Sequence, residues 1–168
     1  MQLRKEIHKL YAEVRKNPEN FECIKSDELL TAYNKETNSY LDNKTSKEIA
    51  ESVEKSLDLL TCIKKNKKEL LQTLVGYRYV DQLDELHMGK FTRWIQKYPL
   101  DPETNRAKVE RGGFLANIDF TDDGVILTIR MWNKKVYKLA FDNCLIYQKL
   151  SVGEELILMT ADYIGEDE

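Results

Sequence analysis

The residues best placed for acid–base chemistry are the adjacent carboxylates Asp84 and Glu85, which lie near His87 in the chain. Such groups act as general acids and bases when they converge on a substrate. Their position in a loop leading into a strand favours surface or capping roles instead. The sequence also lacks a nucleophile elbow, a phosphate-binding glycine loop and a paired-histidine zinc motif. We therefore expect no catalytic residues, no cofactor and no enzyme activity.

Metal chemistry is considered at one acidic loop and at the cysteines. The run from Asp119 to Gly124 has the composition of a calcium loop, but an EF-hand needs a glutamate at its twelfth position, and that position is Arg130. A hairpin turn is the better interpretation. The cysteines form no C-x-x-C pair, so we expect reduced thiols and no metal site at Cys23, Cys62 and Cys144.

Basic and aromatic side chains alternate on two predicted strands, a composition typical of surfaces that bind single-stranded nucleic acid. The predicted contacts are Lys90, Arg93, Arg130, Trp132, Lys134 and Lys135. Strand alternation places Arg130 and Trp132 on the face opposite Ile129. The ordinary interpretation is that Trp94, Trp132 and Tyr137 are core residues or cross-strand pairs, with the lysines on the solvent face. The sequence leaves both interpretations open.

The chain as a whole has 168 residues, of which 26 are basic and 29 acidic, giving a net charge of −3. This balance argues against a general nucleic-acid coat or a polybasic membrane anchor, because both need an excess of lysine and arginine. No apolar stretch approaches the roughly 18 residues of a membrane span. The charged N-terminus lacks the apolar core of a secretory signal. We expect an intracellular protein without a membrane partner.

Residues 1–75 are predicted to form a helical arm, because they contain no glycine and one proline. Helices are expected over residues 2–16 and from Ser26. Thr45 and Glu48 have capping-box spacing and should begin a long helix that ends at Gly76. Its apolar stripe would extend about 40–45 Å, more than a small domain can cover alone. We therefore predict contacts with another subunit or a partner protein at Val53, Leu57, Leu60 and Ile63.

Residues 76–168 are predicted to form a β domain with five short strands, over 89–95, 114–120, 125–132, 136–141 and 144–150. Ser151 and Glu154 repeat the capping-box spacing and should open a terminal helix. Closure of the strands on themselves would remove exposed edges. The expected fold class is α+β: an N-terminal helical hairpin or arm, then a small antiparallel β-barrel (SH3-like or Sm-like) with a C-terminal capping helix.

Parts of this β domain resemble uncharacterised proteins encoded by large double-stranded DNA viruses. The segments that carry the resemblance are Gly89–Ile95, Gly112–Phe114, and Cys144–Leu150 followed by the terminal helix. The resemblance covers about residues 76–165 and includes no catalytic motif. It implies a setting in the host cytoplasm, the nucleus or the virion and leaves the activity open.

The sequence thus predicts a non-enzymatic interaction or assembly protein, such as a viral structural or accessory component. Its partner would be another protein or a second copy, bound through the N-terminal helices. The alternative is a small barrel that binds RNA or single-stranded DNA. The first hypothesis depends on the apolar stripe of the arm, and the second depends on the basic and aromatic residues of the strands.

Overall fold

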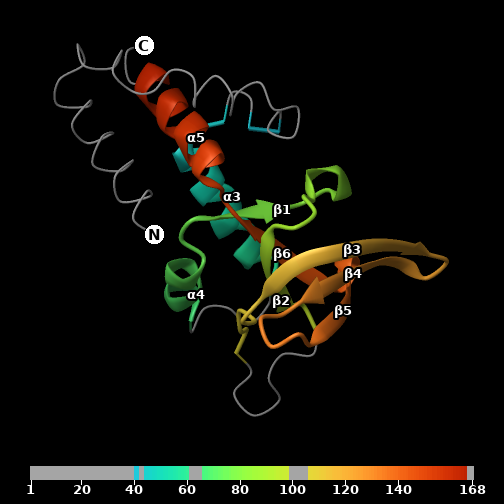
Figure 1. Cartoon of the computed structure of the whole chain (residues 1–168). Helices are drawn as coiled ribbons and strands as arrows, with labels where there is room; N and C mark the ends of the chain where they lie inside the picture. The colour runs from blue at the N-terminus through green and yellow to red at the C-terminus, as the bar shows by residue number, and fades with distance from the viewer. Residues whose placement is uncertain (1–39, 42–43, 61–65, 99–105, 166–168) are drawn as a thin grey trace. The chain divides into compact units, whose positions relative to one another are not determined.

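The computed structural model describes residues 40–41, 44–60, 66–98 and 106–165 (Figure 1). The chain divides into two compact units, one made of residues 1–48 and 150–168, the other of residues 49–149. The second unit joins helical residues to the sheet, so this division differs from the predicted boundary between residues 75 and 76. The helices predicted over residues 2–16 and from Ser26 lie outside the described residues.

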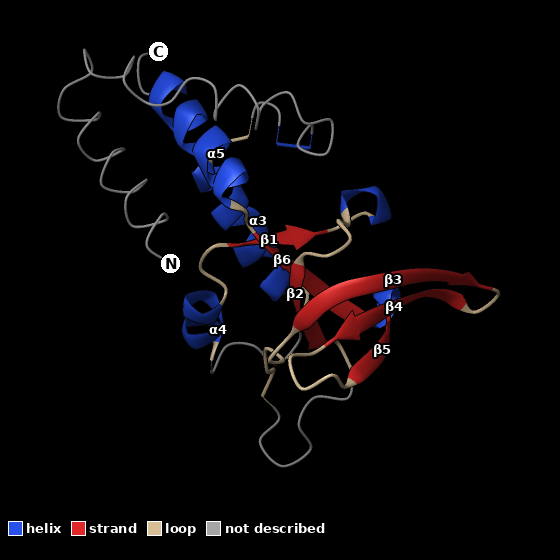
Figure 2. Ribbon diagram, viewed as in Figure 1, coloured by secondary structure: helices blue, strands red, loops and turns tan. Residues whose placement is uncertain are grey.

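Six antiparallel strands form one sheet in the unit of residues 49–149, as Figure 2 shows. Their bounds are β1 Tyr77–Val80, β2 Phe91–Gln96, β3 Gly113–Thr121, β4 Gly124–Arg130, β5 Val136–Ala140 and β6 Cys144–Lys149. The order across the sheet is β1-β6-β2-β3-β4-β5, so β1 and β5 are its edges. The hairpin of β3 and β4 extends past the ends of the other strands (Figure 1).

The predicted barrel closure is not formed by the described strands, which make an open sheet. A short 3-10 turn over Phe141–Asn143 carries the chain from β5 to β6. Strand β6 then lies between β1 and β2 and pairs with both, which leaves it no edge for β5. The five predicted strands are present, and β1 is an additional strand that the sequence reading missed.

The predicted long helix is two helices, α3 over Ser46–Asp58 and α4 over Lys67–Thr73. The capping box that begins α3 is confirmed: Thr45 N–H donates to Glu48 Oε2 at 2.8 Å, and Glu48 N–H donates to Thr45 Oγ1 at 3.3 Å. One straight helix would carry its far end beyond the sheet. Two shorter helices bring Leu57 and Leu70 into the same core cluster.

The sheet is covered on both faces by apolar clusters. One cluster packs the two helices on the sheet and consists of Val53, Leu57, Leu60, Leu70, Leu74, Tyr77, Ile95, Ala107, Leu145 and Tyr147. The other consists of Val80, Leu86, Trp94, Leu115, Leu127, Ile129, Leu139, Cys144 and Ile146. Consecutive residues such as Trp94 and Ile95 enter opposite clusters because side chains alternate along a strand. The helices and one face of the sheet therefore share one core cluster, and the opposite face carries the second.

The unit of residues 1–48 and 150–168 contains helix α5, Val152–Gly165. Its predicted capping box is confirmed, since Ser151 N–H donates to Glu154 Oε2 at 2.5 Å and Glu154 N–H donates to Ser151 Oγ at 3.3 Å. Within the described part of the chain, no helix has both the length and the apolar character that a bilayer span requires.

Candidate functional site

The β4–β5 hairpin is the candidate site, and its register sets which side chains share a face. Arg130 pairs with Val136, and Thr128 pairs with Lys138. The alternate pair, Leu127 with Leu139, is buried in the core. Arg130, Val136 and Lys138 therefore lie on the face opposite these leucines, and all three are exposed.

The turn of this hairpin presents two lysines to solvent. Met131 N–H donates to the carbonyl of Lys135 at 2.9 Å, and Lys134 N–H donates to the carbonyl of Met131 at 3.0 Å. The Asn133 side chain accepts from Lys135 N–H at 3.1 Å, which fixes the turn further. Lys134 has a φ of 62°, a left-handed conformation that is uncommon outside glycine. The cationic groups are thus carried by a well-defined turn.

Trp132 lies in the same turn and is 79% exposed. Its ring meets the Phe114 ring edge-on, with centroids 4.9 Å apart and planes at 82°. Phe114 pairs with Arg130 across β3 and β4 and also contacts Phe91, at 5.4 Å between centroids. The Phe91 and Phe114 rings therefore support the Trp132 ring, which stays exposed to solvent beside Arg130. The interpretation of Trp132 as a core residue is wrong, whereas Trp94 is in the core.

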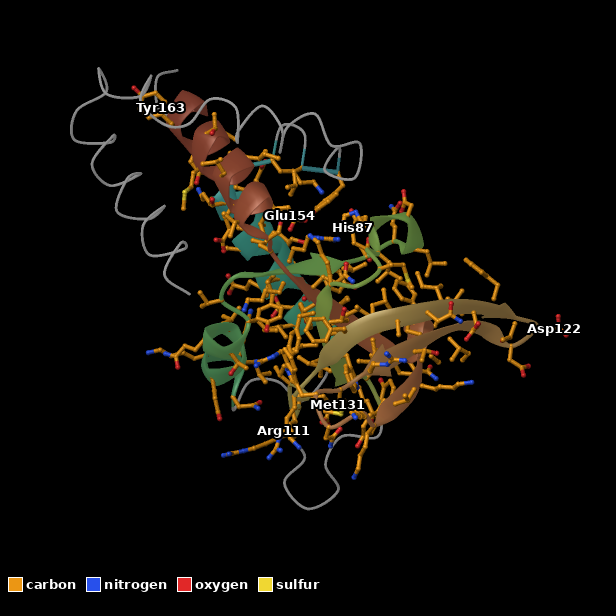
Figure 3. All side chains as sticks on the ribbon, in the orientation of Figure 1. His87, Arg111, Asp122, Met131, Glu154 and Tyr163 are labelled. Atoms are coloured by element: carbon orange, nitrogen blue, oxygen red, sulfur yellow. The ribbon has the colours of Figure 1, made fainter. Side chains whose placement is uncertain are left out.

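The charge on the β4–β5 hairpin is of one sign. Residues 124–141 contain no aspartate or glutamate and four cations, Arg130, Lys134, Lys135 and Lys138. The acidic pair Asp122 and Asp123 lies in the β3–β4 turn, and Figure 3 places Asp122 at the far tip from Met131. The cations and Trp132 therefore share the end of the sheet that is remote from these carboxylates. We call this group, Arg130, Trp132, Lys134, Lys135, Val136 and Lys138, the basic hairpin surface.

Two of the predicted nucleic-acid contacts lie elsewhere. The Arg93 guanidinium lies over the Tyr77 ring, 5.3 Å from its centroid, and donates to the Thr73 carbonyl at 3.4 Å. Lys90 lies just before β2. Because side chains alternate along a strand, it lies on the same face as Thr92 and on the face opposite Phe91. Burial and the charge of Arg78 lower the pKa of Lys90 to about 7. The structure brings together four of the six predicted residues, Arg130, Trp132, Lys134 and Lys135.

A buried polar row lies near Lys90, and the sequence reading did not find it. Arg78, Gln148 and Thr92 are neighbours across β1, β6 and β2, and each is at most 2% exposed. The Gln148 amide pairs with the backbone N–H and carbonyl of His87, both at 2.9 Å. Arg78 donates to the Glu85 carbonyl, and Thr92 Oγ1 donates to the Lys90 carbonyl at 3.1 Å. The row holds the backbone of the loop between β1 and β2.

The loop between β1 and β2 contains the two carboxylates that we considered for catalysis. Asp84 and Glu85 lie in a 3-10 turn, Leu83–Glu85. The Glu85 carboxylate is 4.0 Å from the Arg78 guanidinium, and Arg78 also contacts Nδ1 of His87 at 3.2 Å. Because a guanidinium only donates, that contact requires Nδ1 to be an acceptor. These groups position one another. Among the described residues, no three histidine, cysteine or carboxylate side chains gather in a metal-binding cluster.

The predicted protein-contact residues of the helical stripe have a different place in the structure. Val53, Leu57 and Leu60 are buried in the core between the helices and the sheet. They pack within their own unit, and their contact with a partner protein stays a prediction. Ile63 lies outside the described residues.

No family model matches the chain, and neither does any curated protein or solved structure. The resemblance to proteins of large DNA viruses stays a prediction. The functional argument therefore depends on the chemistry of the basic hairpin surface.

Proposed function

We propose that this chain is a non-enzymatic interaction protein that contacts a partner protein through the basic hairpin surface. The observation that carries this proposal is the exposure of Trp132, which the Phe114 ring supports from one side. Val136 and Tyr137 on the same hairpin are also exposed, at 53% and 46%. Tryptophan, tyrosine and arginine are the residue types that dominate binding energy at protein interfaces.

The surrounding charge supports an acidic partner. Arg130, Lys134, Lys135 and Lys138 surround the exposed apolar side chains, and the hairpin has no carboxylate of its own to neutralise them. The positive hairpin would attract an acidic partner surface during encounter and would repel a basic one. In this proposal the partner-binding role that we first assigned to the helical stripe belongs to the hairpin.

Binding of single-stranded nucleic acid is the second candidate function. Its support is the same exposed indole, which lies beside Arg130 and the two turn lysines. An indole face can stack on a base while cations contact the adjacent phosphates. The two candidates place their ligands on the same surface and differ in ligand chemistry.

Affinity capture tests the protein-partner proposal. The tagged chain is compared with Trp132→Ala and with a Lys134→Glu/Lys135→Glu double variant, after nuclease digestion. Phe120→Ala is the matched control, because Phe120 is 76% exposed on the same sheet, next to the acidic turn. We expect a protein that the wild type and Phe120→Ala retain and both hairpin variants lose, with unchanged thermal midpoints. Retention of the same proteins by all four forms would contradict the proposal.

Titration with labelled oligonucleotides tests the alternative. If the hairpin binds single strands, log affinity should fall with log salt by about 0.7 per phosphate contact. Trp132→Ala should then cost roughly 1–3 kcal/mol of binding energy through lost stacking. Absence of binding at micromolar protein in low salt would eliminate the nucleic-acid function and leave the partner-protein proposal.

A further inference from the structure

Strand β5 is an open edge of the sheet, and its hydrogen-bond pattern shows which of its backbone groups point outward. The Met131–Lys135 bond closes the hairpin and is in register with Arg130 opposite Val136. Bonded and non-bonded pairs alternate in an antiparallel ladder, so residues 137 and 139 bond to β4. The N–H and C=O groups of Val136 and Lys138 and the N–H of Ala140 then point away from β4, whereas the Ala140 carbonyl belongs to the 3-10 turn that follows. Among the described strands, none pairs with β5 on this side.

The first three residues of β5 are exposed on both faces, whereas Leu139 is buried. Val136, Tyr137 and Lys138 are three consecutive exposed residues, although successive side chains point to opposite faces. The other edge strand, β1, differs because three of its four residues are buried. An extended segment could therefore pair with β5 without displacing any described side chain.

The positive charge of the β5 edge determines which extended segments could pair with it. A second copy of β5 would bring two hairpins of the same positive charge together, which disfavours self-pairing. Lysines on an edge strand are a common device against indiscriminate pairing of this kind. A segment with glutamate or aspartate at alternate positions would pair its carboxylates with these lysines. The same residues that exclude a second copy therefore favour an acidic strand.

We infer that the β5 edge binds an extended, acidic segment of the partner protein as an added strand. This inference rests on the proposed function and specifies the partner and its mode of binding. Backbone pairing would satisfy the outward groups of Val136 and Lys138, which a nucleic acid cannot do in a regular ladder. The rings also favour a peptide: Tyr137 contacts Trp94 on the other face, with centroids 6.3 Å apart. Phe114, which contacts Trp132, is half-buried, so among the described residues no second exposed ring accompanies Trp132 on the cationic face.

A synthetic peptide tests the inference directly. The probe is a capped nine-residue peptide that alternates glutamate with valine, titrated into the full chain at two salt concentrations. We expect binding that weakens with salt, together with slower amide hydrogen exchange at residues 136, 138 and 140. The control peptide has the same sequence with N-methyl groups on the amides that would pair with β5, and it should not bind. Equal binding of both peptides, or no binding of the first, would overturn the inference.

Two substitutions at Val136 test the backbone pairing without changing the charge of the hairpin. Val136→Pro removes an outward N–H and leaves the ladder to β4 intact, whereas Val136→Ala keeps that N–H. The proline variant should lose at least ten-fold in peptide affinity relative to the alanine variant. If circular dichroism shows that the proline variant is unfolded, the N-methylated peptide decides the question. Loss of a captured partner in the Trp132→Ala variant without any peptide pairing would overturn strand addition and retain the proposed function.

Discussion

Burial of the Lys90 ammonium makes the free energy of unfolding depend on pH between about 7 and 10.5. The pKa of Lys90 is lowered from 10.5 to about 7, first by burial and then by the charge of Arg78. Between these two values the unfolded chain holds a proton that the folded chain releases. The contribution of Lys90 to the free energy of unfolding therefore rises with pH across this window.

We predict that Lys90→Met flattens this dependence. Wild-type protein should become more stable between about pH 7 and pH 8.5, whereas the variant should show a smaller slope. The range stops there because the pKa of Cys144 is raised from 9.0 to about 11 by burial, which has the opposite effect at higher pH. Urea unfolding at three pH values measures the slope. Lys68→Met, at an exposed position, is the control, and equal slopes in all three proteins would contradict the prediction.

Among the strands, the backbone at the start of β3 packs closely against both of its neighbours, β2 and β4. A Cβ atom on Gly113 would lie 2.5 Å from the Arg130 carbonyl oxygen of β4. Gly112 has a φ of 82° and would place a Cβ atom 2.5 Å from the Thr92 carbonyl oxygen of β2. The two glycines therefore let β3 pass between β2 and β4 and bring Phe114 next to Arg130. They position the ring that supports Trp132.

We predict that Gly113→Ala costs more stability than Gly89→Ala. The Gly113 variant must push β3 away from β4, at about 1–3 kcal/mol or more. Gly89 has a φ of 75° with nothing within 4 Å of its Cβ position, so only the left-handed backbone penalty of about 1–2 kcal/mol applies. Chemical denaturation of both variants compares these costs. A smaller loss for Gly113→Ala would mean that the two strands separate easily at this point.

At the scale of the whole molecule, α3, α4 and the sheet should unfold together. Leu57 is fully buried and shares a cluster with Leu70, Ile95 and Leu145, which come from different elements. Truncating it removes contacts with helices and strands at once. The described residues of the predicted arm in this unit, 49–60 and 66–75, therefore pack as part of the sheet's core.

Leu57→Ala should lower the free energy of unfolding by about 2–5 kcal/mol. Helical circular dichroism and tryptophan fluorescence, which reports on Trp94 in the sheet, should shift to the same lower midpoint. Leu59→Ala is the matched control because Leu59 is 64% exposed, and its effect should stay within about 0.5 kcal/mol. Separate midpoints for the two signals would show that the helices and the sheet unfold independently.

Most of the local structure can be predicted from residues that are close together in the chain. The capping boxes at Thr45 and Ser151, the strands after Gly112 and the turn at residues 121–124 depend on neighbours a few residues apart, and all are present. The outward position of Arg130 also followed from alternation along one strand. Turn chemistry and side-chain period are readable in the order of residues.

Which elements meet depends on contacts between residues that are far apart in the chain. Pairing of β6 with β1 and β2 left the sheet open and aligned Arg78, Gln148 and Thr92, which are far apart in the chain. Division of the predicted long helix placed Leu57 and Leu70 in one core and removed the stripe from the surface. Burial and strand neighbours are set by contacts between distant residues, and no local pattern encodes them. The exposure of Trp132 and the open edge of β5 are therefore properties of the folded sheet.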